Sequence, residues 1–177
     1  MGINRKLTVV GHIQRRAMRW QLGLDGVQLS LQSTLDVFPS LSFSEASAIN
    51  EDGDICGKHG PYSEAFLLDN VAGTLVNRSL AQLVNNSREY SQNYRASALN
   101  NLAVPQVVGG VSVYSTRGVF LRSPEVLWQG STVIDLRNAT PSPAMEPSYL
   151  TSINDAGWMA GQGWDGVLHR PVVLKRQ

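Results

Sequence analysis

Residues 49–57 read INEDGDICG, and this stretch decides the fold because three similar stretches occur elsewhere in the chain. They are residues 3–11 (INRKLTVVG), 99–109 (LNNLAVPQVVG) and 153–161 (INDAGWMAG). The copies start 46, 50 and 54 residues apart, and the Asn precedes the closing Gly by seven residues, or by nine in the third copy. Self-similarity at a period of this size is the signature of a repeat architecture. The chain is therefore predicted to be a tandem array of units of about 50 residues.

Each unit is predicted to hold four short strands. Asn50 and Gly53 take the first and fourth positions of a tight turn, and the strand after it closes on Gly57, where a close backbone approach is possible. Apolar runs predict a third strand at residues 17–20, 65–68, 118–121 and 166–168, and runs that open with Gly predict a fourth at 26–29, 73–76 and 130–133. Residues 80–94, with room for a helical turn or two, are interpreted as an insertion between strands.

Four strands in about 50 residues is the size of a propeller blade. The predicted fold is therefore all-β, with tandem four-stranded antiparallel units in a β-propeller-like array of three complete units and one half. In a single repeat domain, 1–177, the units span approximately residues 1–46, 47–96, 97–150 and 151–177, the last one partial.

Composition narrows the classes of function. Charged residues make up 16% of the chain, and the net charge is +1, from 15 basic and 14 acidic residues. Nucleic-acid binding normally needs a concentrated basic face, so no nucleic-acid partner is expected. No apolar run is long enough to span a membrane. Cys56 is the single cysteine, which excludes an internal disulfide and predicts a small buried apolar residue.

The repeated stretch resembles the HAF family of probable extracellular repeats, a bacterial family with the pattern G-I-N-x-x-G-x-V-V-G followed by H-A-F-L-W. Residues 49–57 with 64–68 (EAFLL), residues 2–11 with Trp20, and residues 153–161 carry the resemblance. The third copy departs from the pattern at 99–101 (LNN), and no copy contains the His-Ala-Phe triplet. The resemblance implies a propeller-like array at the cell surface or outside the cell, and it implies no catalytic residues.

Candidate sites are few. Asn50, Asp52 and Asp54 alternate as the oxygen ligands of a calcium loop do, with a solvated turn as the alternative, because the twelfth position lacks a bidentate Glu. Trp158 and Trp164, which flank a presumed hairpin end, form a candidate stacking platform for a sugar, with core packing as the alternative. His59 is a further candidate ligand contact, although no metal-binding His spacing occurs.

The predicted function is that of a non-enzymatic extracellular or surface module that binds or scaffolds, with a glycan or a protein as its partner and no cofactor. No GxSxG or GxxxxGK[ST] motif is present. A propeller-type hydrolase or lyase domain and a purely architectural surface array are the alternatives. Both chain ends carry first halves of units, so exposed strand edges predict self-association, docking onto a partner, or membership of a longer array.

Overall fold

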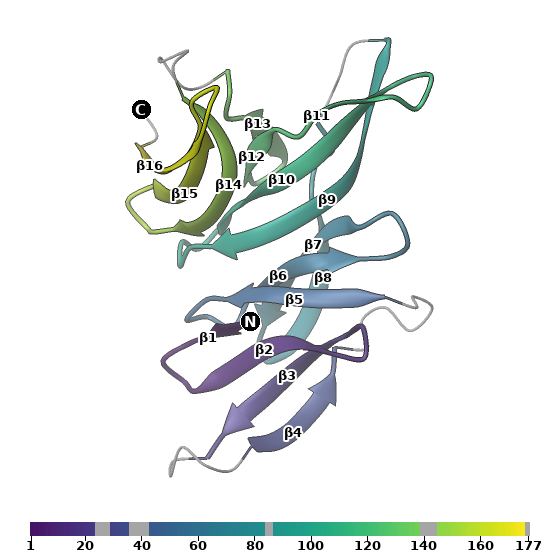
Figure 1. Cartoon of the computed structure of the whole chain (residues 1–177). Helices are drawn as coiled ribbons and strands as arrows, with labels where there is room; N and C mark the ends of the chain where they lie inside the picture. Colours follow the sequence, from purple (N-terminus) through teal and green to yellow (C-terminus); the bar gives the residue numbers. More distant parts are fainter. Residues whose placement is uncertain (24–28, 36–42, 84–86, 139–144, 176–177) are drawn as a thin grey trace.

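The computed structural model describes residues 1–23, 29–35, 43–83, 87–138 and 145–175. Its described residues form strands and turns and contain no helix, which confirms the all-β prediction. Four antiparallel sheets follow one another along the chain, from sheet 1 at the bottom of Figure 1 to sheet 4 at the upper left. The described part of the chain holds no helix long and apolar enough to cross a membrane.

The first two sheets are four-stranded meanders, in which each strand pairs with the next one along the chain. Sheet 1 contains β1 (Gly2–Ile3), β2 (Thr8–Ile13), β3 (Arg16–Leu22) and β4 (Leu29–Thr34). Sheet 2 contains β5 (Ser44–Ile49), β6 (Ile55–His59), β7 (Glu64–Val71) and β8 (Thr74–Ser79).

The last two sheets depart from four strands. Sheet 3 contains β9 (Glu89–Leu99), β10 (Gln106–Ser115), β11 (Phe120–Arg122), β12 (Glu125–Gln129) and β13 (Thr132–Asp135). Sheet 4 contains β14 (Glu146–Ile153), β15 (Trp158–Trp164) and β16 (His169–Lys175). Each sheet begins with the strand before the repeated Asn, so the sheets start earlier than the units read from the sequence.

Two of the predicted third strands were misplaced. In sheet 3 the third strand is β12, whereas residues 118–121 lie in a turn and in β11, which pairs with the far end of β10. In sheet 4 the third strand is β16, and residues 166–168 lie in the preceding turn. The cause is the same in both, because Gly118 and Gly166 have φ angles of 79° and 94°, which place them in hairpin turns.

The region predicted as an insertion, 80–94, holds no helix among its described residues. Its second half is the start of β9, an 11-residue strand, and residues 84–86 lie outside the described part. At the end of this region, Tyr94 packs into the core between sheets 2 and 3. The predicted fourth strand at 26–29 falls mostly outside the described residues.

The sheets stack face to face, and the core consists of three apolar layers between them. In β7, Phe66 and Leu68 face sheet 1, whereas Leu67 faces sheet 3. In β12, Trp128 faces sheet 2 and Leu127 faces sheet 4. Successive side chains of a strand point to opposite faces, so a sheet covered on both sides needs an unbroken apolar run. This is why the third strands read as apolar runs rather than as alternating patterns.

The repeated asparagines join each sheet to the next. Their Oδ1 atoms accept a backbone N–H from the strand that follows in the same unit, at 2.8 to 3.0 Å. Their Nδ2 atoms donate across the sheet boundary, from Asn4 to the Asn50 carbonyl (3.0 Å), from Asn50 to Asn100 (3.1 Å) and from Asn100 to Asn154 (3.3 Å). A carboxamide carries both an acceptor and donors on one short side chain, which explains why Asn recurs here. We refer to this series as the Asn ladder.

The predicted turns are formed, and the residue after each Asn adds a second series of contacts. Gly53 N–H donates to the Asn50 carbonyl at 3.2 Å, and Gly157 N–H donates to Asn154 at 3.0 Å. The backbone N–H of Glu51 then donates to Asn101 Oδ1 at 2.8 Å. The Asn turns of neighbouring sheets are therefore held by two kinds of hydrogen bond.

Candidate functional site

A cavity of about 380 Å³ lies where the first strands of sheets 2, 3 and 4 come together. It is lined by equivalent positions of the repeated units, which come from β2, β5, β6, β9 and β14. Five residues before the repeated Asn are Glu45, Arg95 and Tyr149, and three residues before it are Ser47, Ser97 and Thr151. Met1, His12, Ala46, Lys58 and Ala96 complete the lining.

A β-bulge in each first strand turns a hydroxyl toward this cavity. Ala46 and Ala48 pair with consecutive residues of β6, which leaves Ser47 as the extra residue. The same irregularity leaves Ser97 unpaired in β9 and Thr151 unpaired in β14. Bulges redirect a side chain and are frequent next to functional sites.

The closing glycines of the repeat make these bulges possible. A Cβ added to Gly57 would lie 2.0 Å from the carbonyl oxygen of Glu45. At Gly109 and Gly161 the corresponding distances, to the carbonyls of the first strands of their own sheets, are 1.9 Å and 2.1 Å. These three glycines serve close backbone approach and not a positive φ, since none of them has one.

Two ion pairs flank the cavity. Lys58 Nζ lies 2.9 Å from Glu45 Oε2. The Arg95 guanidinium is paired with Glu125, lies against Gly110 and has its Cζ 4.8 Å from the centre of the Tyr149 ring. Each pair joins one cation to one carboxylate, so the charges of Lys58 and Arg95 are both balanced by a partner.

Glu125 anchors Arg95 from behind the cavity wall. Its side chain is fully buried, and Oε2 accepts the backbone N–H of Leu150 at 3.0 Å, which joins sheet 3 to sheet 4. Burial raises the pKa of Glu125, against the lowering effect of the nearby Arg95 charge. The arrangement fixes the orientation of the Arg95 side chain rather than supplying a reactive group.

The three hydroxyls at the cavity are available for a ligand. Ser47, Ser97 and Thr151 make no side-chain hydrogen bond to another described residue, and His12, the imidazole at the cavity, bonds to none of the three. A nucleophilic serine needs a hydrogen-bonded base, and none of these three hydroxyls bonds to one among the described residues.

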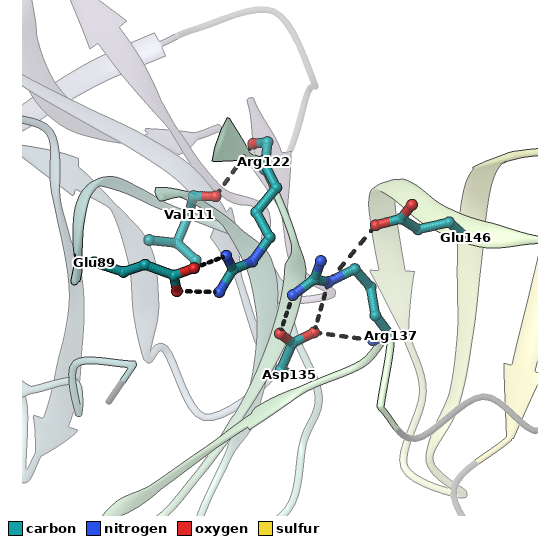
Figure 2. A network of polar contacts seen from close by, with 7 residues as sticks. Glu89, Val111, Arg122, Asp135, Arg137 and Glu146 are labelled. Carbon is teal, nitrogen blue, oxygen red and sulfur yellow. Dashed lines mark hydrogen bonds and ion pairs between the residues drawn. The ribbon is translucent and has the colours of Figure 1, made fainter. Parts of the chain in front are cut away.

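A second polar cluster, in sheet 3 and at the start of β14, is structural. Figure 2 shows Arg122 held by both oxygens of Glu89, at 2.7 Å each, and Arg137 held by Asp135 at 2.6 Å. Arg137 Nε also lies 3.6 Å from Glu146. Every charge in this cluster has a partner, and the pairs connect β9 to β11 and β13 to β14.

The residues predicted as site candidates from the sequence lie outside the lining of this cavity. Asn50 and Asp54 bond to each other, at 2.9 Å between Nδ2 and Oδ2, and Asp54 Oδ1 accepts Asn70 N–H at 2.8 Å. These bonds occupy oxygens that the calcium hypothesis would use, and the carbonyl of Asp52 accepts the Asn70 amide at 2.7 Å. Within the described ranges, no three His, Cys, Asp or Glu residues are grouped so that they could hold a metal ion.

Trp158 and Trp164 were predicted to flank a hairpin end, and this prediction is wrong. Trp158 and Trp164 are the first and last residues of the single strand β15, and their rings lie against Lys175 and His169 of β16. Six residues of extended strand separate their Cα atoms by roughly 20 Å, so they are not one platform. His59 lines a smaller cavity of about 210 Å³ with Trp128 and Tyr94, between sheets 2 and 3.

The cavity residues have a sequence signal that was missed. Six of them lie three or five residues before Asn50, Asn100 or Asn154. The residue types around these positions differ too much between the units for an alignment by identity to find them. Cys56, in contrast, lies where the sequence predicts, fully buried, and burial raises the pKa of its thiol to about 12.

Comparison with known proteins adds no relative. No family model, no curated protein and no solved structure matches this chain.

Proposed function

We propose that this chain is a non-enzymatic binding module that holds a hydroxyl-rich ligand, a glycan segment, in the cavity between its first strands. The observation that carries the proposal is the set of three bulges, which aim Ser47, Ser97 and Thr151 into one space. Three units of the chain contribute the same kind of group at the same offset, so the cavity belongs to the repeat as a whole.

The chemistry of the lining suits a neutral polar ligand. Hydroxyls donate and accept hydrogen bonds, the oxygens of Glu45 have lone pairs beyond the one used by Lys58, and Tyr149 offers an exposed ring. Sugars present hydroxyls in the ring plane and C–H groups on the ring face, which match this combination of polar groups and an aromatic surface. A strongly charged ligand would have to disrupt one of the two ion pairs.

The propeller-like arrangement and the extracellular location belong to the same proposal. The first strands of sheets 2, 3 and 4 line one cavity, and blades of a propeller likewise place strands around a central channel, which supports this part of the proposal. The HAF resemblance is the source of the expected location outside the cell or at its surface.

The test is binding to an array of neutral and acidic oligosaccharides, followed by titration calorimetry on the strongest ligand. Ser97→Leu inserts a branched side chain into the cavity and is expected to weaken binding at least tenfold. Ser152→Ala, on the neighbouring exposed position of β14 outside the cavity lining, is the matched control and is expected to bind as the wild type does.

Equal affinity of the wild type and Ser97→Leu would place binding elsewhere on the molecule. Hydrolysis of any array compound, measured as the release of new reducing ends, would replace the proposal with the propeller-type hydrolase alternative.

A further inference from the structure

Each sheet has two different apolar faces, which we name by direction. The leading face is turned toward the preceding sheet, and the trailing face is turned toward the following one. The leading face carries the residue before the repeated Asn, which is Ile49, Leu99 or Ile153 in sheets 2, 3 and 4. The trailing face carries a cross-strand pair, Cys56–Leu67 in sheet 2 and Val108–Leu127 in sheet 3.

On the leading face of sheet 1, the first apolar residue is exposed. Ile3 stands at the position of Ile49, Leu99 and Ile153, which are 8 to 9% exposed, yet Ile3 itself is 56% exposed. Next to it, Val9, which is 9% exposed, pairs with the half-buried Trp20 at the place that Ile55 and Leu68 occupy in sheet 2. The carbonyl of Asn4 also lacks the Asn ladder bond that the carbonyls of Asn50, Asn100 and Asn154 accept.

Sheet 4 has the complementary uncovered face. Ala160 and Val173 form the cross-strand pair of its trailing face, and Val173 is 65% exposed. Asn154 is exposed, whereas Asn4, Asn50 and Asn100 are 1 to 6% exposed. Its Nδ2 atom makes no hydrogen bond to any described residue, whereas the other three donate to the next sheet.

From these observations we infer that the trailing face of sheet 4 binds the leading face of sheet 1 in a second copy of this chain. The contact repeats an interface that the chain already makes three times. Asn154 Nδ2 donates to the Asn4 carbonyl of the other copy, and Ile3 and Trp20 cover Ala160 and Val173. Within one copy, sheets 2 and 3 separate the two faces (Figure 1).

Charge supports a second copy as the occupant. In the second series of contacts, Glu51, Asn101 and Asp155 each supply a side-chain oxygen to the preceding unit. Sheet 1 has Arg5 at this position, which offers no acceptor. Its side chain is 91% exposed, with Nε 3.8 Å from Glu51 Oε1, and it also meets the Asp155 carboxylate when the turns are juxtaposed in this way. An ion pair then replaces the backbone-to-side-chain bond.

The experiment uses two exposed positions, one on each face. Ile3→Glu blocks the leading face of sheet 1, and Val173→Glu blocks the trailing face of sheet 4. Light scattering after size-exclusion chromatography, over a hundredfold range of concentration, is expected to show association for the wild type and a monomer for each variant. Since each variant keeps one intact face, an equimolar mixture is expected to form a 1:1 dimer and nothing larger.

Thermal unfolding of each variant checks that the fold is intact, and Val119→Glu, at an exposed residue of the β10–β11 turn, is the matched charge control and should associate as the wild type does. A wild type that stays monomeric at all concentrations, or a mixture in which no dimer forms, would overturn the inference. It does not depend on the cavity, so the glycan array and the scattering experiment fail or succeed separately.

Discussion

Replacing Gly57 by Ala tests the connection between the repeated glycine and the bulge that shapes the cavity. The new Cβ would lie 2.0 Å from the Glu45 carbonyl oxygen and 2.8 Å from Phe66 Cζ. Real Cβ atoms keep at least 3.0 Å from such neighbours, so β5 has to retreat from β6 by about 1 Å.

That retreat lengthens the β5–β6 hydrogen bonds next to Gly57 and displaces the Phe66 ring. Two weakened bonds cost about 2 kcal/mol, and repacking of an overfilled core adds 1 to 3 kcal/mol. We expect a loss of about 3 to 5 kcal/mol in the free energy of unfolding. For a chain of this length, the melting temperature should fall by about 10 °C.

Gly11→Ala is the matched control, because Gly11 holds the same position in sheet 1. Its added Cβ would meet only side-chain atoms, of Trp20 at 3.4 Å and of Met1 at 3.6 Å, which is ordinary contact. A strand glycine replaced by Ala then stabilises by up to about 1 kcal/mol through the unfolded state. Urea unfolding and calorimetry on both variants give the comparison. Equal shifts of melting temperature would refute close backbone approach as the reason for the repeated glycine.

Three further predictions concern single side chains. Asn50→Ala removes a buried amide with bonds in two sheets and should cost about 2 to 4 kcal/mol, whereas Asn154→Ala, at an exposed amide, should cost under about 1 kcal/mol in urea unfolding at low protein concentration. The Cys56 thiol, with its pKa raised to about 12, should resist a disulfide reagent at pH 8 in the folded protein and react fully in guanidinium; rapid native reaction would contradict its burial. Burial raises the pKa of Glu125, so its carboxyl stabilises the fold below the unfolded value near 4.5, and this contribution is lost as pH rises through the folded value. The stability of the wild type relative to Glu125→Gln should therefore fall from pH 4 to pH 8, and parallel curves would contradict it.

Local chemistry made much of the fold predictable. The Asn and Gly at the first and fourth positions of the turn, and the closing Gly seven residues on, depend on backbone geometry that neighbouring residues specify. The apolar runs at residues 17–20 and 65–68 correspond to β3 and β7 because they are buried on both faces. The same reasoning failed at residues 118–121 and 166–168, where Val and Leu side chains stand exposed in or beside hairpin turns.

The sites were less accessible to sequence reasoning. His59, Trp158 and Trp164 were chosen as candidates because their residue types often bind ligands. In the structure His59 lines the smaller cavity between sheets 2 and 3, whereas the two tryptophans lie at opposite ends of β15. Ser47, Ser97 and Thr151 carry no distinctive motif, and their place at the cavity comes from bulges that face a glycine of the neighbouring strand.

From the order of its residues alone, this chain is specified as a repeating, all-β array, since turn residues and apolar runs act over a few positions. Tertiary structure decided the rest. Contacts between residues about 50 positions apart give the repeated Asn its role as a link between sheets, and they bring the bulged hydroxyls to one cavity. The exposure of Ile3 and Val173 on the outer sheets also depends on how the sheets stack. Such contacts follow from how whole sheets stack, which no local pattern encodes.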